Sequence, residues 1–215
     1  MVGMTRAHLA DPHVVAKVMR GQEDRIRPCV GATYCLDRIY EGGEALCIHN
    51  AATGREARMP HVIGRAGTSR RVGVVGAGPG GLEAARVALE RGHEVTVLEA
   101  ADRPGGQMNL LAANPRRREM AAIVDWRLDE IARMGGEIRC NLLAEAGDVL
   151  ALAPEVVVVA TGGLPQPPRM EGADHALSSW DLISGAVRPQ GRGLVYDDGG
   201  GHAGVTAAGV AAGGG

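Results

Sequence analysis

A glycine-rich turn between a strand-like run and a helical pattern constrains the fold of this chain more than any other feature. The motif Gly76-x-Gly78-x-x-Gly81 directly follows the apolar run 71–76. In that setting the first glycine permits a tight turn, the second lets a pyrophosphate approach the backbone, and the third allows the helix to pack closely on the strand. The residues expected to face the phosphates are Gly76, Gly78, Pro79, Gly80 and Gly81.

An acidic residue stands where a dinucleotide fold needs one. Glu99 ends the second expected strand, 18 residues beyond Gly81. A carboxylate there can bind an adenosine ribose, and it disfavours a 2'-phosphate. A glycine-rich turn that binds nothing is the alternative, but the complete order of strand, turn, helix, strand and acid favours a site. The sequence therefore predicts the adenine-dinucleotide half of a flavin- or nicotinamide-binding Rossmann unit.

The order of elements predicts an α/β fold with a parallel sheet, because strands and helices alternate along the chain. The expected strands are residues 71–76, 93–99, 136–141 and 155–160, and the expected helices are residues 79–91 and 116–134. Before a domain boundary near residue 70 we expect a short strand up to Ala7, a helix starting at Asp11 and a cysteine-bearing loop. A further short strand is expected at Leu194–Tyr196, followed by a Gly/Ala-rich helix at 205–212.

Size and charge exclude several classes of partner. The 215 residues suffice for one complete domain and parts of others. A formal net charge of -2 offers no basic field for nucleic acid or an anionic membrane. Apolar runs fall far short of the roughly 20 residues of a membrane span, and no targeting signal opens the chain. We expect a cytoplasmic protein with no nucleic-acid and no membrane partner.

Three cysteines, Cys29, Cys35 and Cys47, lie in a segment rich in glycine and turn residues. In a cytoplasmic chain this grouping suggests a metal or iron–sulfur site rather than a disulfide. Free thiols are the alternative, and a structural zinc site is disfavoured because a fourth ligand is missing. His49 is a conceivable extra ligand, and Cys140 is expected to be a small buried hydrophobe.

Two further glycine motifs carry a family resemblance. Arg103-Pro104-Gly105-Gly106-Gln107 follows Glu99, and Ala160-Thr161-Gly162-Gly163 follows a buried-type strand. Together with the first motif they resemble the FAD-binding domain of flavoprotein reductases with two dinucleotide domains. The resemblance implies that Gly106, Gln107, Thr161 and Gly162 lie near the flavin nucleotide.

The cysteine segment resembles the cluster loop of the NADH:flavin oxidoreductase family related to old yellow enzyme, of the trimethylamine dehydrogenase and 2,4-dienoyl-CoA reductase type. The resemblance rests on residues 27–35 and 47–50. In that family four cysteines hold a [4Fe-4S] cluster, and Ala32 stands where the second would be. It implies a 4Fe-4S cluster with three cysteine ligands, Cys29, Cys35 and Cys47. The remaining iron would take water, another side chain or substrate, or be absent.

The same resemblance implies a domain plan. Residues 2–7 are similar to the last strand of the family's (β/α)8 barrel, in which the arginine matching Arg6 helps to hold the FMN phosphate. The implied parts are the last barrel strand and helix (1–27), the iron–sulfur loop and linker (28–70), the FAD/ADP-binding Rossmann-like domain (71–190) and the start of a second NAD(P)-type domain (191–215). The substrate-binding barrel would then lie outside this chain, which alone is expected to be inactive.

The implied function is electron transfer between FMN, an iron–sulfur cluster and a dinucleotide, either FAD or ADP, with NAD(P)H as a further cofactor. The variant Cys-Val-Gly-Ala-x-Tyr-Cys is similar to the branch that demethylates small N-methylated amines, and enoyl-type substrates belong to the wider family. An electron-transfer protein would be the partner. No general acid or base can be assigned. The alternative is a non-enzymatic ADP-binding or electron-relay module.

Overall fold

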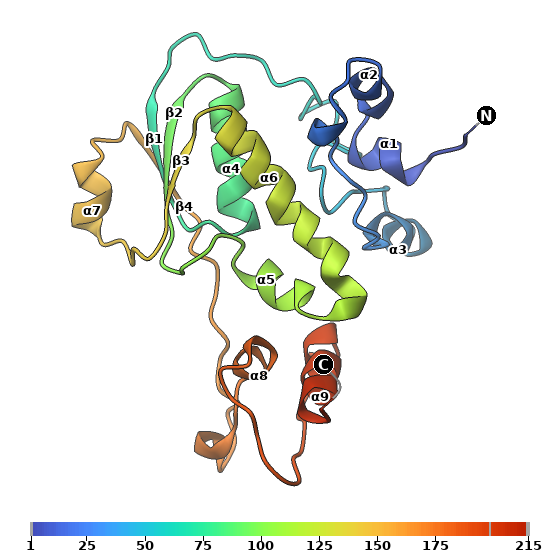
Figure 1. The fold of residues 1–215 in the computed structure, drawn as a ribbon, viewed down its shortest axis with the longest axis vertical. Helices are drawn as coiled ribbons and strands as arrows, with labels where there is room; N and C mark the ends of the chain where they lie inside the picture. The colour runs from blue at the N-terminus through green and yellow to red at the C-terminus, as the bar shows by residue number, and fades with distance from the viewer. Residues whose placement is uncertain (1, 198, 214–215) are drawn as a thin grey trace.

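A four-stranded parallel sheet lies at the centre of the computed structural model, which describes residues 2–197 and 199–213 (Figure 1). The strands are β1 (Arg71–Val75), β2 (Glu94–Leu98), β3 (Glu137–Arg139) and β4 (Val156–Val159), in the order β3-β2-β1-β4. Val72 of β1 is in register with Val95 of β2 and with Val156 of β4. The α/β class and the parallel sheet predicted from the sequence are confirmed.

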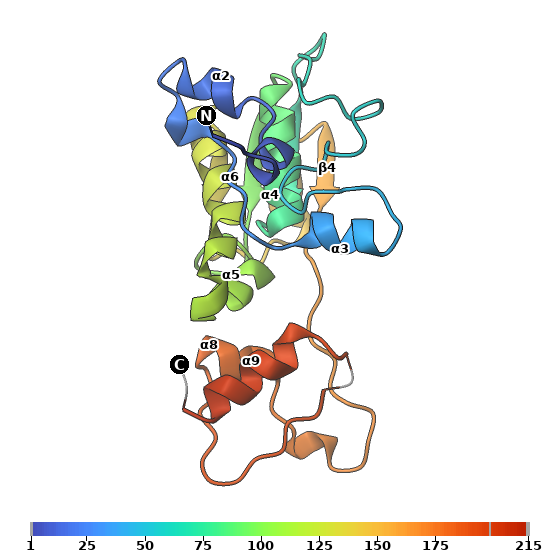
Figure 2. The same cartoon turned by 90° about the vertical axis from the view of Figure 1, so that its right-hand side faces the viewer.

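Helix α4 (Pro79–Glu90) packs on one face of this sheet, and α6 (Ala122–Arg133) packs beside α4 (Figures 1 and 2). Proline at the first helical position suits the start of α4. Its buried positions Leu82, Ala85 and Leu89 follow the helical period, so they share one face. That face joins a core made of Val72, Val74, Ala77, Leu82, Ala85, Leu89, Val95, Val97, Val124 and Ile131.

The N-terminal segment, residues 2–70, lies beside α4 and α6 and is largely irregular (Figures 1 and 2). Its elements are α1 (Arg6–Ala10), α2 (Val14–Val18), a 3-10 turn η1 (Glu23–Arg25) and α3 (Tyr34–Tyr40). The strand expected up to Ala7 is wrong, because residues 2–4 have no regular structure and a helix begins at Arg6. A strand needs a hydrogen-bonded neighbour, and these residues pair with none of the described strands.

The cysteine segment also differs from the expected irregular loop, since α3 forms inside it. Thr33 precedes this helix in the left-handed conformation, with a φ of 58°. The helix expected from Asp11 is present as α2. Of the longer helix expected at 116–134, the first part is the 3-10 turn η2 (Pro115–Ala121).

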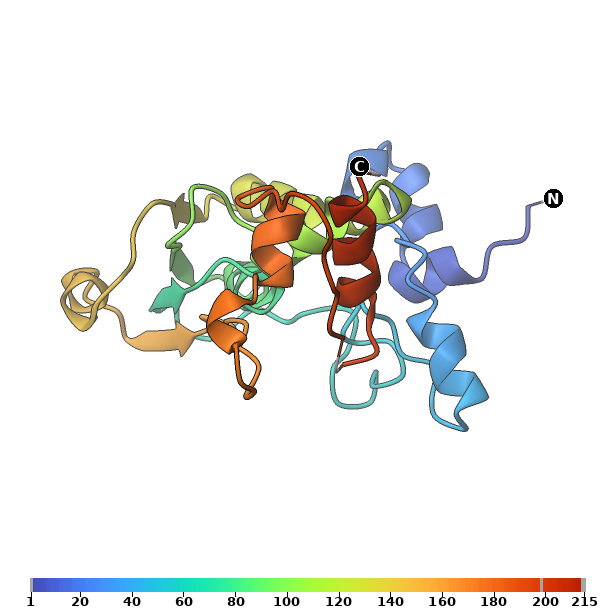
Figure 3. The same ribbon diagram turned by 90° about the horizontal axis from the view of Figure 1, so that it is seen from below.

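The connections between strands carry short helices that the sequence pattern did not predict. Helix α5 (Gln107–Ala112) follows β2, and α7 (Ala146–Ala151) links β3 to β4. In Figure 3, α7 is the tan helix at the end of the molecule opposite the N-terminus. No helix among the described residues has the length and apolar character required to cross a membrane.

After β4 the chain leaves the sheet and forms a separate small lobe (Figure 2). This lobe contains the 3-10 turn η3 (Ala173–His175), α8 (Ser179–Ser184) and α9 (His202–Ala211), with α8 packed against α9. The strand expected at Leu194–Tyr196 is wrong. These residues are exposed, and no described strand pairs with them.

Candidate dinucleotide site

The carboxyl ends of β1, β2 and β4 meet at one edge of the sheet, and the glycine-rich turn lies there. Gly76 takes a φ of 101°, and its N–H donates to the carbonyl of Leu98 at 2.7 Å. A side chain at Gly76 would collide with the carbonyl oxygen of Ala160. The turn therefore requires glycine both for its backbone conformation and for its contact with the end of β4.

Gly81 is closely packed, whereas Gly78 borders open space. A Cβ at Gly81 would collide with the carbonyl oxygen of Gly76, whereas a Cβ at Gly78 would meet nothing within 4 Å. Gly78 is the N-cap of α4, so the unpaired N–H groups of the first helical turn lie next to this open space. Such a helix end attracts anions through these donors and through the helix dipole.

Both carboxylate oxygens of Glu99 accept backbone hydrogen bonds, and one of them comes from the glycine-rich turn. Its Oε2 accepts the N–H of Ala77 at 2.6 Å, and its Oε1 accepts the N–H of Ala101 at 2.9 Å. An ionised carboxylate has about four acceptor positions, so each oxygen can also accept from a hydroxyl. Glu99 is thus fixed beside the turn in the place predicted for a ribose ligand. The role of the Ala77 N–H carries no sequence signal and was missed.

The two other glycine motifs reach the same edge. The N–H of Gly105 donates to the carbonyl of Ala77 at 2.8 Å, and a Cβ on Gly106 would lie 3.2 Å from the Cα of Gly78. Gln107 Nε2 donates to the carbonyl of Gly163 at 3.4 Å. The fold thereby gathers residues that are distant in sequence. Thr161 and Gly162 are exposed beside this contact, just beyond β4.

The other predicted ligands are not brought to one place. Arg6 is exposed at the start of α1. Cys29 is exposed, Cys35 lies in α3, and the Cys47 sulfur accepts the N–H of His49 at 3.4 Å. Within residues 2–197 and 199–213, no three histidine, cysteine, aspartate or glutamate side chains are grouped so that they could hold a metal. Cys140 is half-buried, and burial raises the pKa of its thiol.

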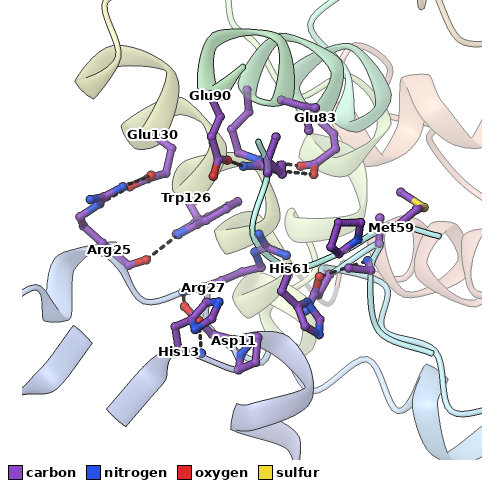
Figure 4. Close-up of a pocket in the computed structure, with 18 of the residues that line it drawn as sticks. Asp11, His13, Arg25, Arg27, Met59, His61, Glu83, Glu90, Trp126 and Glu130 are labelled. Atoms are coloured by element: carbon purple, nitrogen blue, oxygen red, sulfur yellow. Dashed lines mark hydrogen bonds and ion pairs between the residues drawn. The ribbon is translucent and has the colours of Figure 1, made fainter. Parts of the chain in front are cut away.

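A buried polar cluster, which the sequence reading missed, joins the cysteine segment to the helices. Arg127 of α6 is 4% exposed; its Nε donates to Glu83 Oε2 at 2.8 Å and its Nη2 to the carbonyl of His49 at 3.1 Å. Arg86 binds Glu83 at 2.7 Å and Glu90 at 2.6 Å (Figure 4 labels both glutamates). Burial alone would raise the pKa of Glu83, but the Arg86 hydrogen bond and the nearby arginine charges lower it to about 2.

Comparisons with known proteins agree with this geometry. The family described as NAD(P)-binding Rossmann-like domain matches residues 74–124. Over 97% of its length the chain is 56% identical to a probable N-methylproline demethylase from Rhizobium meliloti, and it is 50% identical over 97% of its length to an N,N-dimethylglycine/sarcosine dehydrogenase from Chromohalobacter salexigens. The solved histamine dehydrogenase from Rhizobium sp. 4-9 superposes on all of the chain, with a TM-score of 0.87 and 28% identity.

The chain belongs to the trimethylamine dehydrogenase and old yellow enzyme type of flavin oxidoreductases. The family resemblance drawn from the cysteine segment and the glycine motifs is therefore confirmed. The chain spans 31% of each of the two curated relatives and 34% of the histamine dehydrogenase chain. Its match to these family members includes the N-terminal segment as well as the sheet.

Proposed function

We propose that this chain is the dinucleotide-binding part of a flavin-dependent oxidoreductase that demethylates small N-methylated amines. One observation carries the proposal: Gly76, Gly78, Gly81, Glu99 and Gly106 converge at the carboxyl edge of a parallel sheet, where such folds bind dinucleotides. The substrate class is supported by the names of the two relatives, a demethylase and a dehydrogenase of N-methylated amino acids.

The residues present fit an adenine dinucleotide. The space beside Gly78 is open, and the crowding at Gly76 and Gly81 shapes the turn around it. In the proposed complex the first N–H groups of α4 bind the pyrophosphate and Glu99 binds the ribose. Gln107 and Thr161 border the next part of the ligand. A flavin held here supplies hydride and electron transfer, while the protein binds and orients it.

A second set of proposed cofactors concerns the N-terminal segment. In the whole protein Arg6 would contact the phosphate of FMN, and Cys29, Cys35 and Cys47 would bind an iron–sulfur cluster. Thiolates are the right donors for such a cluster. Their placement in this structure does not fit one, because no three of them are gathered. We therefore derive no step through a cluster, and an anaerobic reconstitution followed by visible spectroscopy tests whether one assembles.

The proposed function is tested by nucleotide binding. The purified chain is titrated with ADP, FAD and NADH by calorimetry, and any nucleotide that co-purifies is identified by mass spectrometry. Binding of both FAD and ADP supports a flavin-bearing oxidoreductase. Binding of ADP without FAD would favour the alternative, an ADP-binding or electron-relay module with an electron-transfer protein as its partner. If none of the three ligands binds, the proposal is wrong.

A further inference from the structure

A cavity of about 410 Å³ lies between the N-terminal segment and the helices α4 and α6 (Figure 4). None of the predicted cofactor-binding residues lines it, so it is separate from the dinucleotide site. Its size falls within the range of about 300–1,000 Å³ that is usual for small-molecule sites. Trp126 of α6 is part of its wall, and Asp11, His13 and Arg27 line it from the N-terminal segment.

The carboxylates that line the cavity already have cationic partners. Asp11 pairs with Lys17 at 2.6 Å, Glu90 pairs with Arg86, and Glu130 pairs with Arg25 at 2.8 Å. Glu83 is held by Arg86 and Arg127. In contrast, the lining arginines that form no ion pair with any described residue are Arg27, Arg58 and Arg91. The cavity lining therefore includes three arginines that no carboxylate of the described residues pairs with directly.

Arg27 is the central member of this group. Its guanidinium carbon lies 4.3 Å from the centre of the Trp126 ring, in a cation–π contact. Its Nε is buried without a hydrogen-bond partner, and burial lowers the pKa of Arg27 to about 10, so the side chain remains charged at neutral pH. The charges of Glu83 and Asp11 favour the protonated side chain, but neither carboxylate accepts the Nε–H, and a buried donor without an acceptor is costly. An anion that entered the cavity would remove that cost.

The rest of the lining suits a compact organic molecule rather than a bare ion. Apolar side chains of Met59, Ile63 and Val87 line the cavity together with the rings of His13 and His61, whose centroids are 6.4 Å apart. We propose that this cavity binds a small organic anion, whose carboxylate or phosphate group pairs with the guanidinium of Arg27. The planar fork of an arginine matches both of these groups, and Arg58 and Arg91 add positive charge around the bound ligand.

Fluorescence of Trp126 tests this proposal directly, because the indole contacts Arg27. The chain has two tryptophans, so a Trp180→Phe background leaves Trp126 as the only reporter. Inorganic phosphate and malonate serve as probes, each titrated at constant ionic strength with chloride as the balancing salt. A saturable change with either probe is expected. The stronger of the two identifies whether phosphate or carboxylate is the preferred group.

Variants then locate the binding. Arg27→Gln is expected to weaken the preferred probe at least about 10-fold, and Arg58→Gln and Arg91→Gln about 3-fold each, because each removes a charge that faces the anion. Arg192→Gln removes an exposed charge outside the cavity and should bind as the parent does. The thermal transition reports independently whether each variant is folded.

The proposal is overturned if neither probe gives a saturable signal, or if folded Arg27→Gln binds like the parent. Should Arg27→Gln fail to fold, the exposed Arg58 and Arg91 decide: unchanged affinity in both of their variants also overturns it. The test needs no enzymatic activity. Its result is therefore independent of the proposed oxidoreductase function.

Discussion

The three glycines of the turn look equivalent in the sequence, but the structure gives them different tasks. Gly76 and Gly81 contact backbone atoms so closely that a methyl group cannot be accommodated, whereas Gly78 borders open space. Its φ of -71° is also one that alanine readily adopts. Gly76 and Gly81 are thus needed by the fold, whereas the fold does not require glycine at position 78, which we propose to lie against the pyrophosphate.

This difference predicts opposite phenotypes for two alanine variants. Gly78→Ala should keep its stability within about 0.5 kcal/mol but lose at least about 10-fold in ADP affinity, because the added methyl occupies the approach of the pyrophosphate. Gly81→Ala should unfold more easily by about 1–3 kcal/mol, the usual cost of overpacking. Thermal unfolding and calorimetric titration with ADP measure the two effects. Equal loss of stability in both variants would contradict the assignment.

Glu99 is predicted to select the nucleotide as well as to hold the turn. We expect Glu99→Ala to weaken ADP binding about 10-fold and to reduce the discrimination against adenosine 2',5'-bisphosphate, because the carboxylate that repels a 2'-phosphate is removed. Glu94→Ala, an exposed change at the start of β2, is the control. The two ligands are compared by calorimetry. An unchanged preference between them would show that Glu99 only supports the turn.

At the scale of elements, sequence patterns predicted helices and strands well where neighbouring segments of the chain pack on each other. The unit β1–α4–β2 matches the predicted ranges closely. The predicted ranges were 71–76, 79–91 and 93–99, and the structure has 71–75, 79–90 and 94–98. The predictions of strands up to Ala7 and at Leu194–Tyr196 were wrong, because strand pairing is not a local property of the sequence. The convergence of the three glycine motifs was expected only through the family resemblance.

The buried polar cluster that joins α4, α6 and the cysteine segment could not be predicted from the sequence. Glu83 and Arg127 are 44 positions apart, and Arg127 and His49 are 78 positions apart. Charged residues on a helix are usually solvated, so no pattern marks those that become buried. Only the docking of the N-terminal segment turns these side chains inward.

The buried polar cluster predicts a loss of folding stability in acid. The pKa of Glu83 is about 2 in the folded chain, against a reference value of 4.5. Since the folded pKa is the lower one, the stabilisation is complete above pH 4.5 and is lost as the pH falls toward 2, up to about 3 kcal/mol in all. We expect Glu83→Gln to be less stable at pH 7 and to show a shallower decline over that range.

Urea unfolding followed by Trp126 fluorescence in the Trp180→Phe background measures this slope. Glu44→Gln, an exposed change in the N-terminal segment, is the matched control. If the free energy of unfolding falls in parallel with pH for the parent and Glu83→Gln, the arginines of the buried polar cluster do not stabilise the Glu83 carboxylate. In that case another acidic group would have to account for the acid sensitivity of the chain.

Buried residues are distributed unevenly over the molecule. The sheet, α4, α6 and the N-terminal segment contain nearly all of the buried residues, whereas Ala207 is the only one described beyond residue 160. The lobe of α8 and α9 meets α5, and among the described residues Asn114 Nδ2 donates to Thr206 Oγ1 of α9 at 3.3 Å. Leu194 is 95% exposed. The free energy of local unfolding should therefore be lower for the lobe of α8 and α9 than for the sheet and its packed helices.

Amide hydrogen exchange tests this uneven stability, with α9 and α4 as helices of similar length, 10 and 12 residues. Amides of α9 are expected to exchange at least about 100-fold faster, because α9 buries one alanine whereas α4 buries Gly81, Leu82, Ala85, Arg86 and Leu89. ADP should slow exchange at the start of α4 and leave α9 unchanged, since the predicted site lies on the sheet edge. Equal protection of the two helices would instead mean that the lobe folds cooperatively with the sheet, and protection of α9 by ADP would mean that the lobe contributes to the nucleotide site.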